Sequence, residues 1–175
     1  SKKVPNMIFY GPPGVGKTTL ARIIANGAAM PLHKLNGTTA STADIRAIIS
    51  ESNSLVAQNG VLLYLDEIQY LNKKQQQSLL EFIENGSITL IASTTENPYF
   101  YIYNALLSRS SVFEFKSVEP EDTVGVLERA WATLNETYKT KKTADREALL
   151  RIAKKCGGDV RMSVGLVENA FFVTD

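Results

Sequence analysis

The chain has 175 residues, of which 44% are apolar and 21% charged, and this ordinary globular composition excludes a disordered or collagen-like protein. Nineteen Lys and Arg residues against eighteen Asp and Glu residues leave a net charge of +1, which excludes strong overall attraction to nucleic acid or anionic lipid. A single cysteine and a single histidine exclude an internal disulfide and a Cys/His zinc site, and no apolar run approaches the length of a membrane span.

Short β-type apolar runs alternate with helical patterns over the first two thirds of the chain. The runs lie at residues 7–10, 32–35, 61–65, 88–92 and 112–115. Asn-Gly pairs at residues 26–27, 59–60 and 85–86 are each expected to end a helix, and Asn72 with Gln75 predicts a capping box at the start of one. The alternation predicts a parallel sheet between two helical layers, a three-layer α/β fold.

No strand pattern follows Pro120. Apolar residues recur instead at helical spacing, as Val126, Ala130 and Leu134 do, and Asp159 is expected to cap the last helix after a Gly-Gly pair. The sequence therefore predicts an α/β domain over residues 1–118 and a small helical domain over residues 119–175.

Residues 11–18 read Gly-Pro-Pro-Gly-Val-Gly-Lys-Thr and match the phosphate-loop pattern, between a predicted strand and a predicted helix. Such a loop points backbone N–H groups at phosphates, while Lys17 reaches the outer phosphates and Thr18 offers its hydroxyl to Mg²⁺. The alternative is a flexible glycine turn with a surface lysine. The predicted ATP-binding residues are Gly11, Pro12, Pro13, Gly14, Val15, Gly16, Lys17, Thr18 and Thr19.

Two carboxylates follow the apolar run at residues 61–65. Asp66, at the tip of the predicted strand, is suited to hold Mg²⁺ through water, and Glu67 is suited to polarise the water that attacks the γ-phosphate. An exposed acidic turn is the alternative. With the phosphate loop, this pair predicts an ATP hydrolase more than a small-molecule kinase, which needs no such base.

The chain resembles the AAA+ ATPases, and within them the branch of clamp loaders and Holliday-junction motors. Three stretches carry the resemblance: residues 10–21, residues 65–77, and residues 91–98 followed by Ala-Leu-Leu-Ser-Arg at 105–109. The Asn-Lys-Lys-Gln-Gln helix start and the Thr-Thr-Glu-Asn-Pro turn in these stretches are similar to those of the replication-associated recombination protein A family. The resemblance covers essentially the whole chain.

The resemblance implies roles for further residues. Thr95, or its neighbour Thr94, would help to hold the attacking water, Arg109 would be an arginine finger that reaches the nucleotide of an adjacent subunit, and Arg161 would sense the γ-phosphate from the helical lid. Asn36 would restrain Glu67. The alternatives are a strand-end hydroxyl for Thr95, a helix-end cation for Arg109, a surface arginine for Arg161 and, preferred over the functional role, a turn residue for Asn36.

The resemblance also implies a DNA-dependent ATPase of the bacterial cytoplasm and nucleoid that acts at stalled forks or gapped DNA. It implies a homo-oligomer of four subunits in a longer protein, with single-stranded DNA-binding protein as a partner, and leaves open whether this chain alone is monomeric. Because relatives carry an adenine-holding segment before this region and an oligomer-building region after it, we expect the chain alone to bind nucleotide weakly and hydrolyse it slowly.

Several alternatives remain open from the sequence. A clamp-loader subunit or a junction-migration motor would share these motifs, and a scaffold that binds ATP without hydrolysing it is the rival from another class. The aromatic residues at 99–101 and Tyr103 are interpreted as packing rather than as a platform for single-stranded DNA. Lys73 and Lys74 fit a DNA-facing surface and a solvated helix start equally well.

Overall fold

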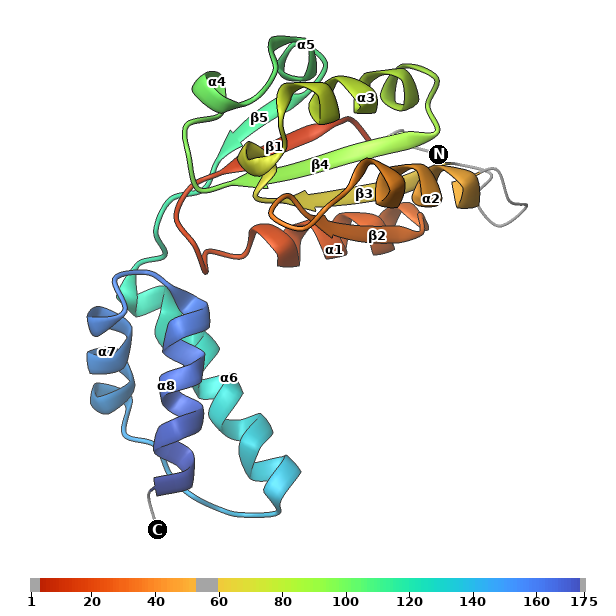
Figure 1. Ribbon diagram of the computed structural model, residues 1–175. Helices are drawn as coiled ribbons and strands as arrows, with labels where there is room; N and C mark the ends of the chain where they lie inside the picture. Colours follow the sequence, from red (N-terminus) through yellow and green to blue (C-terminus); the bar gives the residue numbers. More distant parts are fainter. Residues whose placement is uncertain (1–3, 53–59, 174–175) are drawn as a thin grey trace. The chain divides into compact units, whose positions relative to one another are not determined.

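The computed structural model describes residues 4–52 and 60–173, which form two compact units (Figure 1). The first unit holds the chain up to Gly11 together with Lys17–Phe115, and the second holds Pro12–Gly16 together with the chain from Lys116 onward. The strands are β1 (Met7–Tyr10), β2 (Leu32–Asn36), β3 (Val61–Asp66), β4 (Ile88–Thr94) and β5 (Ser111–Glu114). The helices of the first unit are α1 (Lys17–Ala28), α2 (Thr42–Ser52), α3 (Lys73–Glu84), α4 (Pro98–Tyr101) and α5 (Asn104–Leu107), with a 3₁₀ turn at Ile68–Tyr70.

The five strands form one parallel sheet in the order β2-β3-β4-β1-β5. Strand β3 is buried on both faces from Val61 to Leu65, as its continuous apolar run predicts for a central parallel strand. Because β4 lies between β1 and β3, the carboxyl ends of these three strands meet at one edge of the sheet.

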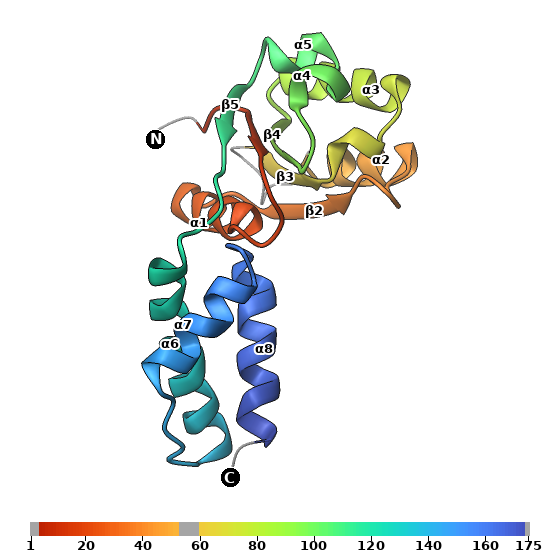
Figure 2. The same ribbon diagram turned by 90° about the vertical axis from the view of Figure 1, so that its left-hand side faces the viewer.

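Helices cover both faces of the sheet, as Figure 2 shows, so the predicted three-layer α/β fold is confirmed. On one face, Ile45 of α2 and Leu79 of α3 pack against alternate strand residues such as Leu63. On the other face, α1 packs against the residues between them, with Ala21 and Tyr64 in the same apolar cluster. This alternation puts Tyr64 and Asp66 of β3 on the side of α1.

The helix boundaries only partly follow the Asn-Gly prediction. Helix α1 continues through residues 26–27 and ends at Ala28, where the left-handed Ala29 (φ 51°) allows Met30 N–H to reach the carbonyl of Ala25 at 3.2 Å. The first Asn-Gly pair is therefore helix interior, and the prediction for it is wrong. Asn85 does end α3, and Asn59 lies outside the described residues.

The predicted capping box at the start of α3 is confirmed. Asn72 Oδ1 accepts the N–H of Gln75 at 2.9 Å, and Gln75 Oε1 accepts the N–H of Asn72 at the same distance. Both orphan donors at this helix start are thus satisfied, which fixes the chain direction three residues after the 3₁₀ turn.

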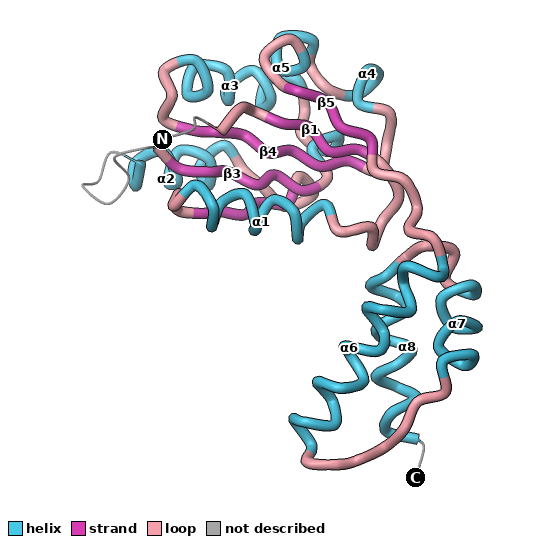
Figure 3. The backbone as a smooth tube through the Cα atoms, turned by 180° about the vertical axis from the view of Figure 1, so that it is seen from behind, coloured by secondary structure: helices cyan, strands magenta, loops and turns pink. Residues whose placement is uncertain are grey.

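The second unit contains three helices that pack side by side: α6 (Pro120–Tyr138), α7 (Arg146–Lys155) and α8 (Val160–Val173) (Figure 3). Its core gathers Leu127, Trp131 and Phe171. The buried stripe of α6 that faces this core runs through Val124, Leu127 and Trp131. Of the predicted stripe, Leu134 packs against the same core, whereas Val126 and Ala130 are not part of it. No helix in the described ranges is long and apolar enough to span a bilayer.

Asp159 caps α8 as expected, because its Oδ1 accepts the N–H of Met162 at 2.9 Å. Within the same unit, the N–H of Val160 donates to the carbonyl of Gly14 at 3.2 Å. A Cβ on Gly14 would lie 1.8 Å from Asp159 Oδ1, and the residue has φ of +72°, so only glycine fits there without displacement.

Candidate active site

The polar residues that follow β1, β3 and β4 come together at the carboxyl edge of the sheet. Tyr10 and Thr94 are register partners on neighbouring strands, and the next N–H, that of Gly11, donates to the carbonyl of Thr94 at 3.2 Å. Asp66 ends the strand on the other side of β4. The loop at residues 11–18 and the acidic pair therefore start from strand ends separated by one strand.

The glycine-rich loop has the backbone that its sequence predicts. Gly11, Gly14 and Gly16 all have positive φ, at 142°, 72° and 98°, and a Cβ on Gly11 would overlap the carbonyl oxygen of Phe115. Lys17, the first residue of α1, is only 8% exposed, and its Nζ donates to the carbonyl of Gly11 at 2.8 Å. The ammonium thus bonds back to the residue at which the loop begins.

The other loop residues differ in exposure. Pro12, Pro13, Gly16 and Thr19 are exposed, whereas Thr18 is partly buried. Val15 is also partly buried. Among these residues, Lys17 and Thr18 have side chains that are hydrogen-bonded within the protein, to the carbonyl of Gly11 and to the Tyr64 hydroxyl.

Thr18 and Asp66 are joined through the hydroxyl of Tyr64. Thr18 Oγ1 lies 3.0 Å from Tyr64 Oη, and Tyr64 Oη lies 3.3 Å from Asp66 Oδ1 and 2.9 Å from Ser93 Oγ. Ser93 Oγ in turn donates to Asp66 Oδ1. The two residues predicted to serve a metal therefore share one hydrogen-bonded network of four side chains.

Neither Tyr64 nor Ser93 was predicted as a site residue from the sequence. Tyr64 is 2% exposed, and burial raises the pKa of its hydroxyl above the ordinary value, so the hydroxyl keeps its proton at neutral pH. The signal in the sequence for Tyr64 was its hydroxyl in an otherwise aliphatic run, two residues before Asp66 and therefore on the same face of the strand. Ser93 gave no signal beyond its place near the end of β4.

Glu67 has an unusual backbone, with φ 53° and ψ 50° in the left-handed region. Gly37 packs against this turn, since its N–H donates to the carbonyl of Asp66 at 2.7 Å and a Cβ on it would lie 2.2 Å from the carbonyl oxygen of Glu67. The end of β3 is therefore shaped by the neighbouring end of β2.

The Glu67 carboxylate receives its hydrogen bonds on one oxygen. Gln69 Nε2 donates to Glu67 Oε2 at 2.5 Å, and Thr95 Oγ1 donates to the same oxygen at 3.4 Å. No described side chain donates to Oε1, which leaves this oxygen available to accept from another group. Gln69 was not selected from the sequence, although its position two residues after Glu67 on a tight 3₁₀ turn provided a weak signal.

The structure separates the two candidate threonines. The Thr94 side chain is buried and accepts the N–H of Glu96 at 3.0 Å, whereas Thr95 is exposed and contacts Glu67. Asn36 has the turn role that the sequence analysis preferred, because its Oδ1 accepts from the N–H of Thr38 at 2.9 Å and from the Thr38 hydroxyl at 2.6 Å.

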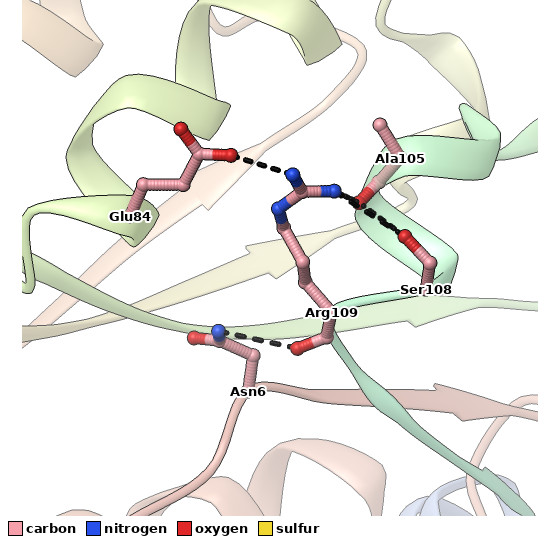
Figure 4. Close-up of polar contacts among 5 residues, drawn as sticks. All are labelled: Asn6, Glu84, Ala105, Ser108 and Arg109. Carbon is pink, nitrogen blue, oxygen red and sulfur yellow. Dashed lines mark hydrogen bonds and ion pairs between the residues drawn. The ribbon is translucent and has the colours of Figure 1, made fainter.

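Arg109 lies after α5, with its guanidinium held by three groups (Figure 4). Its Nη2 pairs with Glu84 Oε1 at 2.7 Å, and its Nη1 donates to the carbonyl of Ala105 at 3.0 Å and to Ser108 Oγ at 3.3 Å. Its own carbonyl accepts from Asn6 Nδ2 at 3.4 Å. Within this chain the side chain thus has the helix-end role, and it remains 42% exposed.

Arg161 lies on the first turn of α8 and is exposed. Within residues 4–52 and 60–173, no carboxylate pairs with it. Within the same ranges, no group of three or more His, Cys, Asp or Glu side chains lies close enough together to hold a metal ion.

The aromatic segment after β4 is exposed, so its interpretation as packing is wrong for three of its four residues. Tyr99, Phe100 and Tyr101 of α4 are 62%, 81% and 52% exposed. Tyr103 is partly buried, with Lys73 Nζ 5.3 Å from its ring centroid. The four-residue helix is too short to bury one face, which is why the aromatic character did not lead to packing.

Comparison with known proteins adds family evidence to this geometry. Residues 7–118 match the family described as "ATPase family associated with various cellular activities (AAA)". The chain is 37% identical over 175 residues to replication-associated recombination protein A of Bacillus subtilis, covering 99% of this chain and 41% of that protein. It is 35% identical to the ATPase WRNIP1 of Dictyostelium discoideum, over 97% of this chain and 20% of that protein.

Among solved structures, the RuvB Holliday junction branch migration motor of Thermotoga maritima superimposes with a TM-score of 0.79 at 26% identity. The match covers 95% of this chain and 54% of the motor. The chain thus spans about two fifths of the length of the first relative named above and about half of the motor.

Proposed function

This chain belongs to the AAA family of ATPases, and we propose that it binds ATP at residues 11–18 and hydrolyses it with Glu67 as the base, in a DNA-dependent cycle. The observation that carries the proposal is the juxtaposition at the sheet edge, where Thr18 at the start of α1 is joined through the Tyr64 hydroxyl to Asp66, the residue that ends β3 and precedes Glu67.

Phosphate binding follows from the loop and from Lys17. Positive φ at three glycines is the backbone conformation in which a phosphate loop can turn its N–H groups toward an anion, and the N-terminus of the twelve-residue α1 carries partial positive charge. Lys17 Nζ, now bonded to the carbonyl of Gly11, exchanges that neutral acceptor for a phosphate oxygen, which is the stronger acceptor.

Thr18 and Asp66 are the residues suited to Mg²⁺. Both offer oxygen atoms, which this cation prefers, and both lie within 3.3 Å of the same Tyr64 hydroxyl oxygen, so the two are close enough to serve one ion. Bound Mg²⁺ would neutralise negative charge on the phosphates. The protein contributes the hydroxyl and the carboxylate, and it keeps both ordered through Ser93 and Tyr64.

Hydrolysis requires a base that can take a proton from water. Glu67 Oε2 is occupied by Gln69 and Thr95, which hold the carboxylate in place, while Oε1 is free to accept the proton as the water oxygen attacks the γ-phosphate. The left-handed turn and the close approach of Gly37 concern the backbone of Glu67, whereas Gln69 and Thr95 hold its carboxylate. This arrangement supports a hydrolase over a scaffold that only binds ATP, since a scaffold needs no such base.

Arg109 and Arg161 would complete the cycle. An exposed guanidinium such as that of Arg109 can leave Glu84 to stabilise the transition-state charge on the nucleotide of a neighbouring subunit, in a homo-oligomer of the longer protein. Arg161 is exposed at the start of α8, and we assign to it the γ-phosphate-sensing role that the family resemblance implies.

We further propose action on DNA at replication forks or gaps. The similarity to replication-associated recombination protein A supports this, and so does the exposed aromatic helix α4, whose rings can stack on unpaired bases near the exposed lysines 73 and 74. A junction motor or a clamp-loader subunit is the second candidate, favoured by the likeness to RuvB.

The test is ATP turnover with and without DNA in the wild type and in Glu67→Gln, with Glu81→Gln as the matched control on the exposed face of α3. We expect Glu67→Gln to bind ATP normally and to lose turnover by a factor of about 100 or more. Stimulation by gapped DNA but not by a four-way junction supports the fork and gap role. Normal turnover in Glu67→Gln would place the base elsewhere.

A further inference from the structure

Tyr64 is the one residue of β3 that combines deep burial with a polar group at the candidate site. Its ring packs in the apolar cluster between the sheet and α1, with Ala21, Ala25 and Leu62. Its hydroxyl emerges from that cluster among Thr18, Asp66 and Ser93. The ring alone would fill the apolar space equally well as phenylalanine, so packing does not require the hydroxyl.

The direction of the hydrogen bonds in this network is determined by the carboxylate. An ionised Asp66 carboxylate can only accept hydrogen bonds, so Ser93 must donate its single hydroxyl proton to Asp66 Oδ1. Ser93 Oγ can then only accept from Tyr64, whose proton lies within reach of Ser93 at 2.9 Å and of Asp66 at 3.3 Å. With the Tyr64 proton committed to either group, the remaining contact at 3.0 Å requires Thr18 to be the donor.

This order has a consequence for Thr18. A threonine hydroxyl has one proton and two lone pairs, and a cation can be bound only through a lone pair. When Tyr64 accepts the Thr18 proton, the lone pairs of Thr18 Oγ1 are turned away from the network. A hydroxyl free to rotate would present its proton to the cation in part of its conformations and would have to be reoriented on binding.

We propose that Tyr64 is a positioning residue that accepts the proton of Thr18 and thereby orients the Thr18 hydroxyl for a divalent cation bound with the nucleotide. The proposal rests on the function proposed above, in which Thr18 and Asp66 serve Mg²⁺. It assigns to Tyr64 no contact with nucleotide or with the cation, and its effect should appear only in the part of nucleotide affinity that depends on the cation.

The experiment is calorimetric titration of the chain with ADP, in Mg²⁺ and separately in EDTA. The variants are Tyr64→Phe and the matched control Tyr138→Phe, which removes the same hydroxyl from an exposed ring of α6 in the other unit. In Tyr64→Phe we expect the enhancement of ADP affinity by Mg²⁺ to fall by about three- to tenfold, the worth of one hydrogen bond, with the affinity in EDTA unchanged. Tyr138→Phe should match the wild type in both conditions.

A second variant separates proton direction from general support of the site. In Ser93→Ala, Tyr64 can still donate to Asp66 directly and accept from Thr18, so the enhancement by Mg²⁺ should fall less than in Tyr64→Phe. Equal losses in the two variants would overturn the proposal, because the network would then act as a packed unit. A parallel loss of ADP affinity in EDTA would overturn it as well, as would an unchanged enhancement in Tyr64→Phe.

ADP binding by the wild type distinguishes failure of the proposed function from failure of the role assigned to Tyr64. No ADP binding by the wild type, or binding that Mg²⁺ does not strengthen, contradicts the proposed function itself and with it the role of Tyr64. Strengthening by Mg²⁺ in the wild type that persists in Tyr64→Phe contradicts only the role of Tyr64.

Discussion

Because the backbone of Glu67 is left-handed, we expect the protein to be more stable with glycine than with alanine at this position, the reverse of the usual order within a helix. For an L-residue the left-handed conformation costs about 1–2 kcal/mol, and glycine avoids this cost but loses about 0.5–1 kcal/mol through its greater freedom in the unfolded chain. Glu67 has φ 53° and ψ 50° in the middle of this region. We therefore expect Glu67→Gly to be more stable than Glu67→Ala by about 0.5–1 kcal/mol.

The comparison is made between two variants at one position, so the lost contacts with Gln69 and Thr95 cancel. Glu81, exposed within α3, provides the matched control, and there alanine should be more stable than glycine by about 1 kcal/mol. Urea unfolding followed by circular dichroism measures both differences. A glycine variant at position 67 that is less stable than the alanine variant, as at position 81, would refute the left-handed geometry.

Three further predictions concern Arg109, the capping box and the start of α2. If Arg109 acts across subunits, mixing the full-length Arg109→Ala and Lys17→Ala proteins should restore ATP turnover that neither has alone, and failure to restore it would leave Arg109 only its helix-end role. Asn72→Ala should lower the free energy of unfolding by about 1 kcal/mol, measured by urea unfolding, and a loss near zero would contradict the capping box. The hydroxyl and the N–H of Ser41 donate to the Asp44 carboxylate at 2.6 and 2.8 Å and lower the pKa of Asp44. The stability that these contacts contribute is therefore fully present above the unfolded pKa of Asp44 and is lost as pH falls through its lower folded pKa. Ser41→Ala should raise the pKa of Asp44 in an NMR titration, and an unchanged pKa would contradict these contacts.

Elements with a strong local signal were predictable from the sequence. The run at residues 61–65 is buried throughout, and the loop at 11–18 has the positive φ angles that its glycines allow. In α6 the local signal was ambiguous, because residues 124, 127 and 131 follow helical spacing as well as residues 126, 130 and 134 do. Packing against α7 and α8 buries the first set, and only Leu134 of the second packs on the same core. The end of α1 was missed because an alanine, not a glycine, adopts the left-handed conformation there.

The finer structure of the site depends on contacts between distant segments. Thr18, Tyr64 and Ser93 meet only because β4 lies next to β3 and α1 covers that face, and neither fact can be obtained from residue spacing. The end of β2 packs so closely on the Glu67 turn that a Cβ on Gly37 would overlap the carbonyl oxygen of Glu67. The sequence indicated which chemical groups the site contains, whereas strand order determined which of them touch.

Equilibrium binding of ATP with Mg²⁺, measured by calorimetry on the wild type and Lys17→Ala, tests the central claim most directly. Lys34→Ala, which removes an exposed lysine from β2, is the matched control. We expect the wild type and Lys34→Ala to bind alike and Lys17→Ala to lose detectable binding, because the buried ammonium, bonded to the carbonyl of Gly11 at 2.8 Å, supplies the positive charge that pairs with the phosphates. Unchanged affinity in Lys17→Ala would contradict the assignment of residues 11–18 as the phosphate-binding loop.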